Sequence, residues 1–193
     1  MGGPIFVEVR VPGFGTVGAA HTRRVPEARI DGVLEATSVD AMGARHTLLA
    51  LLRGFSQDQV GSLVTDMSET YGEPARVLDL DEQGEAVIRY TVAIRDLRSP
   101  PLRAMARFQR AMGVPWMTAR EGEVLLYAEA PTPERGAEAV DRVRRYLSDH
   151  GVPGQVDMRT ATAEDRATHD RLLALLRRFG SVEANRLAAE AMN

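Results

Sequence analysis

The most regular alternation of hydrophobic and polar positions lies in residues 85 to 95, EAVIRYTVAIR. Every second residue from Ile88 to Ile94 is apolar, and the row between them is mixed and carries Arg89, which predicts a half-buried strand. In residues 99 to 113, a Ser-Pro start and a final glycine enclose apolar residues that recur at helical spacing. The pattern therefore predicts a strand followed by a helix.

The pattern continues with two strand-like segments, at 114 to 120 and at 123 to 130. Because only a Glu-Gly pair separates them, they are expected to form a hairpin. A helix with a Thr-Pro start follows over residues 132 to 151, and residues 154 to 160 complete the series as a strand. The order β-α-β-β-α-β predicts an α+β fold, a ferredoxin-like antiparallel sheet with two helices.

The first 80 residues show a looser version of the same layout. Residues 5 to 11 and 32 to 39 have strand-like sequences, and the apolar run GARHTLLALLRG, residues 43 to 54, is interpreted as a helix. A second helix, over residues 56 to 72, starts with a capping box, and residues 75 to 81 form a further strand. The α+β arrangement is therefore expected to be tandem.

The C-terminal segment differs from both halves. Thr162 is suited to cap a helix over residues 163 to 179, and Gly180 separates it from a second helix that Ser181 caps. Such a pair makes a helical hairpin or an incomplete helix-turn-helix. The chain is accordingly divided into an N-terminal α+β half (1–83), a ferredoxin-like half (84–161) and a helical pair (162–193).

The amino-acid composition excludes several classes of function. The chain of 193 residues has no cysteine, so it contains no disulfide and no thiolate nucleophile. All 24 basic residues are arginine, and the net charge of −3 gives no overall attraction to nucleic acid or to anionic lipid. The sequence shows neither a secretory signal nor an apolar stretch long enough to span a bilayer. A cytoplasmic location and no membrane partner are expected.

Gly13, Gly15 and Gly18 form a G-x-G-x-x-G pattern directly after the first predicted strand. This pattern binds a dinucleotide when its glycines open a helix that leads to a parallel strand. Pro26 follows only eight residues after Gly18, and the chain lacks the repeating β-α-β-α order of such folds. The pattern is interpreted as the start of a mobile connection between two strands. The alternative is a small-molecule or nucleotide-binding enzyme that uses the Gly13–Gly18 loop.

No catalytic or metal-binding motif accompanies this loop. The four histidines are scattered without the paired spacing of metal ligands, and there is no G-x-S-x-G motif. We expect no catalytic residue, no metal site and no cofactor.

Three residues are candidates for binding a ligand. Trp116 is the sole tryptophan, and it lies on a predicted strand, where it either packs in the core or forms the wall of a small-molecule pocket. Arg89 and Arg95 lie on the strand of residues 85 to 95 and face either solvent or an anionic ligand. Both interpretations stay open for each of the three.

With these elements placed, the chain resembles archaeal regulators of the bacterio-opsin activator type. The resemblance is carried by residues 43 to 72, GARHTLLALLRGFSQDQVGSLVTDMSETYG, by the two strands that follow, and by residues 112 to 147, MGVPWMTAREGEVLLYAEAPTPERGAEAVDRVRRYL. It extends to residues 170 to 193, DRLLALLRRFGSVEANRLAAEAMN, and covers residues 34 to 193 in all.

The resemblance implies an α+β sensor region that precedes a DNA-binding helix-turn-helix. It favours a non-enzymatic regulatory protein that binds a small-molecule effector or a partner and forms a homodimer. The sequence ends at Asn193, where the family's recognition helix would begin, and base readout depends on that helix. DNA binding is therefore expected only through a complete helix-turn-helix that these 193 residues do not contain.

Overall fold

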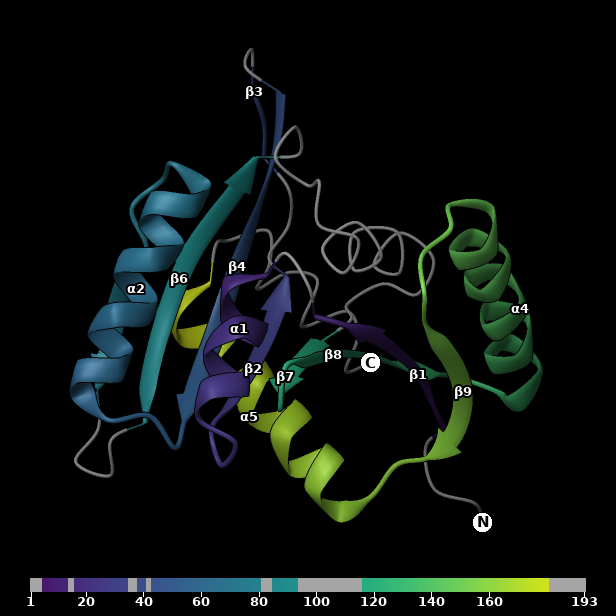
Figure 1. Cartoon of the computed structure of the whole chain (residues 1–193). Helices are drawn as coiled ribbons and strands as arrows, with labels where there is room; N and C mark the ends of the chain where they lie inside the picture. The colour runs from purple at the N-terminus through teal and green to yellow at the C-terminus, as the bar shows by residue number, and fades with distance from the viewer. Residues whose placement is uncertain are drawn as a thin grey trace.

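The computed structural model describes residues 5–13, 16–34, 38–40, 43–80, 85–93 and 116–180, which form nine strands and four helices (Figure 1). The N-terminal elements are β1 (Ile5–Pro12), α1 (Val17–Arg24), β2 (Arg29–Leu34), β3 (Ser38–Asp40), β4 (Gly43–Arg53), α2 (Gln57–Tyr71) and β5 (Arg76–Leu80). They are followed by β6 (Ala86–Ala93), β7 (Trp116–Arg120), β8 (Glu123–Ala130), α4 (Pro133–Asp149), β9 (Gln155–Thr160) and α5 (Ala163–Phe179).

One antiparallel sheet runs through the described residues. Its strands lie in the order β5-β6-β4-β2-β7-β8-β1-β9, and the short strand β3 pairs with β4. Each neighbouring pair is antiparallel, including the central pair of β2 and β7. The predicted α+β class is confirmed.

The expected four-stranded sheet within residues 84–161 is not found in this form. Strand β6 does not join β7, β8 and β9 but lies between β5 and β4, while β1 takes a place between β8 and β9. The alternation along a strand shows that one of its faces is buried, but it does not specify the neighbouring strand. The pairing is set by contacts between distant segments, which the sequence pattern does not contain.

The segment of residues 43 to 54 is a strand, β4, and not the predicted helix. Residues Leu48 to Leu52 are all buried: Leu48, Ala50 and Leu52 face one core cluster, whereas Leu49 and Leu51 face the other. A strand that is buried on both faces has a continuous apolar run, and periodicity does not separate such a run from a buried helix.

Residues 17 to 24, expected as part of a mobile connection, form helix α1. Ala19 and His21 are buried, and His21 Nε2 lies 2.7 Å from Asp66 Oδ2 on α2. The helix is therefore held by packing against its neighbours, which outweighs the weak apolar periodicity of its sequence.

The predicted helix ends that rest on capping residues are confirmed. Helix α2 begins with a full capping box of Ser56 and Gln59, and Gly72 ends it in the left-handed conformation. Thr162 and Asp165 form a second capping box at the start of α5, and the side chain of Thr132 caps α4. The hairpin of β7 and β8 is also as predicted.

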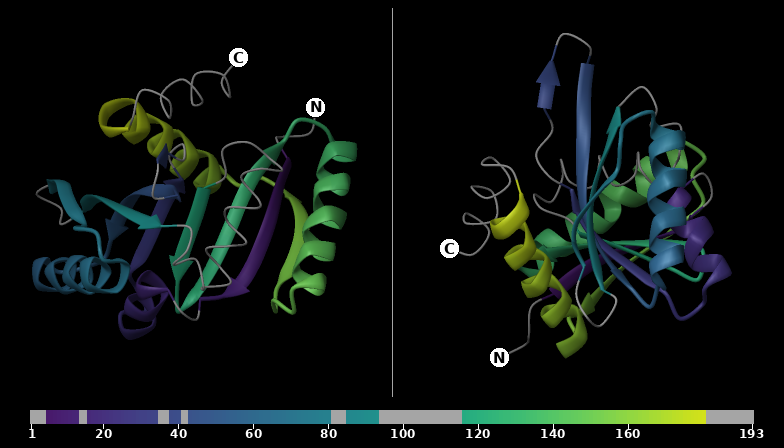
Figure 2. Two further views of the ribbon diagram at one scale, coloured as in Figure 1. Left: turned by 90° about the horizontal axis from the view of Figure 1, so that it is seen from above. Right: turned by 90° about the vertical axis from the view of Figure 1, so that its left-hand side faces the viewer.

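The helices lie on opposite faces of the sheet (Figure 2). Helices α1, α2 and α4 cover one face, where strand residues such as Val7, Leu48 and Leu126 form the larger core cluster. Helix α5 crosses the other face above β2 and β4. Its leucines, with Trp116 and Tyr127 of the sheet, form the smaller cluster, so α5 stands apart from the other three helices.

Three predictions lie outside the described residues: the helix over 99–113, the second C-terminal helix after Gly180, and the position of Arg95. Among the residues that the structure describes, no helix combines the length and apolar character needed to cross a bilayer.

Candidate functional site

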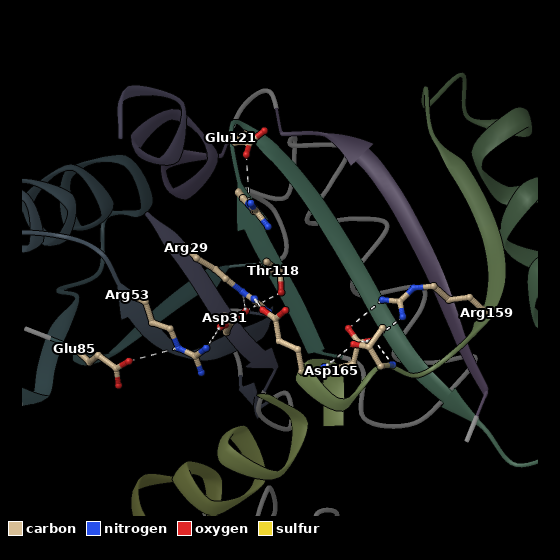
Figure 3. A network of polar contacts seen from close by, with 11 residues as sticks. Arg29, Asp31, Arg53, Glu85, Thr118, Glu121, Arg159 and Asp165 are labelled. Carbon is tan, nitrogen blue, oxygen red and sulfur yellow. Dashed lines mark hydrogen bonds and ion pairs between the residues drawn. The ribbon is translucent and has the colours of Figure 1, made fainter. Parts of the chain in front are cut away.

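Charged side chains gather on the face of the sheet that α5 covers (Figure 3). Because side chains alternate along a strand, Arg29 and Asp31 of β2 point to this face while Ile30 points to the larger core cluster. The same alternation brings Thr118 of β7 and Arg159 of β9 to the α5 face. Ion pairs and hydrogen bonds link these residues to the first turn of α5.

Asp31 is the centre of the first group of contacts. It is 0% exposed, and its Oδ1 accepts hydrogen bonds from Arg29 Nε at 2.7 Å and from Thr118 Oγ1 at 2.8 Å. Its Oδ2 lies 3.6 Å from Arg53 Nη1. The buried carboxylate thus lies between two guanidinium groups, hydrogen-bonded to Arg29 and in looser contact with Arg53.

Arg29 also reaches α5. Its Nη1 donates to Glu164 Oε1 at 2.6 Å, so the same guanidinium joins buried Asp31 to the exposed first turn of the helix. Burial by itself would lower the pKa of Arg29, but Asp31 and Glu164 outweigh this effect and raise the pKa above its ordinary value. Arg29 is therefore a fixed positive charge.

Arg159 is the centre of the second group. Its Nε donates to Glu8 Oε2 at 2.9 Å, and its two terminal nitrogens donate to both carboxylate oxygens of Asp165. Hydrogen bonds to Asp165 are the main reason why the pKa of Arg159 is raised. The guanidinium carbon also lies 5.2 Å from the centre of the Tyr127 ring. Arg159 thus ties β9, β1 and α5 together.

Between these two groups lies a cavity of about 430 Å³, which we call the α5 groove. Strands β1, β2, β7 and β8 and the first turn of α5 contribute its walls. The carboxylates that line it are Glu8, Glu121, Glu123, Glu164 and Asp165. The guanidinium groups that line it are Arg10, Arg29 and Arg120, and Thr118, Leu125 and Tyr127 complete the lining.

Trp116, a predicted ligand-binding residue, lies behind this lining. It is 1% exposed, its ring stacks on Tyr127 at 4.3 Å, and Phe6 meets it edge-on at 6.3 Å. The leucines of α5 belong to the same cluster. Trp116 therefore supports the Tyr127 wall of the groove and reports on the packing of α5.

Arg89 lies on β6, and its half-buried side chain is not part of the groove wall. Strand β4 separates β6 from β2, the nearest strand that lines the groove. Arg95 lies outside the described residues. The structure thus does not bring Trp116 and Arg89 together in one site.

The residues that do form the groove were missed by the sequence analysis. Arg29 and Glu164 are 135 positions apart, so no local spacing joins them. One signal was present: the charged pair Arg29 and Asp31 alternates with apolar residues within a strand, as does Arg159. Such a row is usually solvated, and only the position of α5 shows that these charges are covered.

The glycines of the G-x-G-x-x-G pattern serve packing in the part that is described. A Cβ atom on Gly13 would lie 2.3 Å from Ala19 Cβ and 2.6 Å from Gly122 O. Gly13 N also donates to Gly122 O at 3.1 Å. Both neighbours of β1 are antiparallel to it, whereas a dinucleotide site needs a parallel β-α-β crossover. Gly13 is thus explained by its contact with the β7–β8 hairpin.

Neither the protein-family models nor the curated protein sequences contain a match to this chain. The geometry of the α5 groove is therefore the basis for assigning a function.

Proposed function

We propose that this protein is a non-enzymatic regulator in which the α5 groove binds a small polar effector and α5 reports whether the groove is occupied. One observation carries the proposal. Glu164 and Asp165, in the first turn of α5, line the groove and at the same time hold the helix to the sheet through Arg29 and Arg159. A ligand that competes for these charges changes the attachment of the helix.

The ion pair of Arg29 and Glu164 is weak enough for a ligand to replace it. Glu164 has a side chain that is 73% exposed, and ion pairs of that kind contribute about 0 to 1 kcal/mol. A ligand of modest affinity is therefore strong enough to replace the pair of Arg29 and Glu164. The apolar contacts of Leu172, Leu173 and Leu176 keep α5 on the sheet in its resting position. Binding then shifts an equilibrium between two attachments of the helix.

The topology supports a sensor built from two ferredoxin-like halves that have exchanged their first strands. We count β6 as the first strand of the N-terminal half and β1 as the first strand of the C-terminal half. The two sets of four strands, β5-β6-β4-β2 and β9-β1-β8-β7, then have the same order in the sheet. The two halves meet at the pairing of β2 with β7, where Asp31 lies opposite Thr118. The groove adjoins this junction, so a ligand there contacts both halves.

The output of the sensor follows from the resemblance to archaeal regulators. Helix α5 corresponds to the first helix of the resembled helix-turn-helix, so a change in its attachment would alter the segment that follows. In this proposal the protein is a cytoplasmic homodimer, and any action on DNA requires a complete helix-turn-helix, which the described residues do not form.

Trp116 offers a direct test, because it is the sole tryptophan and lies beneath α5. We would titrate the chain with spermidine, L-arginine, succinate and inorganic phosphate and record acrylamide quenching of its fluorescence. A probe that binds the groove is expected to increase quenching saturably, because α5 loosens. Saturable binding in the groove with no change in quenching, and none in hydrogen exchange of residues 163–179, would contradict the proposal.

A matched pair of variants locates the effect. Glu164→Gln removes the charge that pairs with Arg29, so quenching is expected to increase even without a probe. Asp170→Asn removes an exposed charge from the same helix outside the groove and is expected to leave quenching unchanged.

A further inference from the structure

We infer that the α5 groove is built for a small organic dication, such as a diamine or a short polyamine; this inference rests on the proposed function of the same groove. The charge of its walls is the first argument. The lining has five carboxylates and three guanidinium groups, and Arg159, outside the lining, pairs with two of these carboxylates, Glu8 and Asp165. Carboxylates still outnumber guanidinium groups, five to four, when Arg159 is included. A cleft with a surplus of one sign concentrates ligands of the opposite sign.

The most buried arginine of the groove, Arg29, is already engaged by two carboxylates. Arg29 lies opposite Arg120 on the paired strands β2 and β7, a position that would attract an anion if both were unpaired. Arg29, however, is hydrogen-bonded to Asp31 and Glu164. An anionic ligand would have to displace these carboxylates, which are held within the protein itself, to reach Arg29.

Two carboxylates at the mouth of the groove make only weak, exposed ion pairs, Glu121 with Arg120 and Glu123 with Arg10, so a cation can compete for them. Glu121 and Glu123 have side chains that are 62% and 51% exposed, on the turn and at the start of β8. The closest approach of Glu123 to a described cation is 3.9 Å, to Arg10 Nε, which is a weak contact. A ligand with two positive groups matches these two exposed carboxylates.

A metal ion does not fit these side chains equally well. Calcium takes six to eight oxygen ligands that converge on one point, and magnesium demands octahedral geometry. Among the described residues, no three acidic or histidine side chains converge closely enough to hold a metal ion. The carboxylates of the groove are instead distributed around a cavity of about 430 Å³, which is within the size range of small-molecule sites.

Leu125, which is partly exposed, provides apolar surface in the lining, whereas Tyr127 is only 7% exposed, between Trp116 and Arg159. The methylene chain of a diamine or polyamine would lie against such surface while its amino groups reach the carboxylates. The groove therefore offers both parts of the chemistry that an extended organic cation needs.

The test is isothermal titration calorimetry of the 193-residue chain with spermidine and with putrescine, and with succinate and Mg²⁺ as competing classes. Spermidine is expected to bind more tightly than putrescine, and both are expected to weaken as salt is added. The double variant Glu121→Gln, Glu123→Gln is expected to raise the dissociation constant for spermidine about tenfold. Glu138→Gln, which removes an exposed charge from α4 on the opposite face, is expected to leave the constant unchanged.

Three results would overturn the inference: no heat of binding with either amine, equal weakening by Glu138→Gln, or preferential binding of succinate or Mg²⁺. Its failure is distinguishable from that of the proposed function. If succinate loosens α5 in the quenching experiment and the amines do not bind, the ligand class is wrong and the sensor proposal stands. If spermidine binds in the groove and Trp116 quenching does not change, the ligand class stands and the sensor proposal is wrong.

Discussion

Arg159 and Asp165 join the last strand of the sheet to the first turn of α5 through two parallel hydrogen bonds, one of them 3.0 Å long between Nη2 and Oδ1. The same carboxylate accepts a hydrogen bond from Thr162 N at 2.8 Å and so completes the cap of the helix. Burial alone would raise the pKa of Asp165, but the hydrogen bonds from Arg159 and Thr162 lower it to about 2.

Asp165→Asn is expected to lower the free energy of unfolding at pH 7 by about 1 to 2 kcal/mol, because a charge-assisted pair is lost. The folded-state pKa is depressed, so this stabilisation is present above the ordinary value of 3.8 and is lost as the pH falls through about 2. Urea unfolding between pH 7 and pH 2 should therefore show the difference between variant and parent shrinking. A constant difference over that range, or an equal effect of Asp141→Asn on the exposed side of α4, would contradict the assignment.

Asp31→Asn is expected to be more severe. The substitution removes the charge that Arg29 and Arg53 share, and each guanidinium keeps one carboxylate partner, Glu164 for Arg29 and Glu85 for Arg53. Breaking a buried ion pair costs about 3 to 5 kcal/mol, and the remaining partners place the expected loss at the lower end. Thermal unfolding would measure the loss, with Asp141→Asn on the exposed side of α4 as the control. A loss below about 1 kcal/mol would show that Asp31 does not anchor the two arginines.

His169, in the middle of α5, is expected to make the stability of the folded protein depend on pH. Its side chain packs on the ring of Phe6, with centroids 6.4 Å apart, and Glu129 and Asp170 are the charged groups that face it. Burial lowers the pKa of His169 despite these two carboxylates. The folded state thus favours the neutral ring, and stability is expected to fall as the pH drops below the ordinary value of 6.5.

His169→Gln is expected to remove this decrease, since the amide does not titrate. Melting temperatures between pH 8 and pH 5 provide the measurement, and His150→Gln, at the exposed end of α4, is the matched control. If the parent and His169→Gln lose stability in parallel over this range, the decrease comes from other groups.

Local signals in the sequence were sufficient to predict the helices that begin with a recognisable capping residue. Thr162, with Asp165 three residues later, marks the start of α5, and Ser56 and Gln59 do the same for α2. A cap is a contact between residues close in sequence, so its recognition needs no knowledge of the fold. Strand β4 was misread because its Leu48–Leu52 run is buried on both sides, a property of the complete sheet.

The candidate site could not be predicted from the sequence, because contacts between residues far apart in the chain form it. Asp31 meets Thr118 across the β2–β7 junction, and Arg159 meets Asp165 only because β9 leads directly into α5. The position of β1 between β8 and β9, and that of β6 between β5 and β4, likewise join segments far apart in the chain. Trp116 was found from the sequence because a single tryptophan is conspicuous, yet its contribution is to support Tyr127.

Gly13 and Gly61 form a matched pair that tests the role of the glycine loop. A Cβ atom on Gly13 would overlap Ala19 Cβ and Gly122 O, whereas one on Gly61, in the exposed middle of α2, would meet no atom within 4 Å. Gly13→Ala is therefore expected to lower the free energy of unfolding by about 2 to 3 kcal/mol. Gly61→Ala is expected to raise it by about 0.5 to 1 kcal/mol, because alanine favours the helix.

Chemical denaturation of the two variants and the parent measures both changes under the same conditions. The two variants are expected to change the free energy of unfolding in opposite directions. A general sensitivity to an added methyl group would instead change it in the same direction for both. The steric account of Gly13 would be wrong if Gly13→Ala kept the stability of the parent. In that case a ligand-binding role for the Gly13–Gly18 loop would regain support, and loss of nucleotide binding by the stable Gly13→Ala variant would demonstrate it.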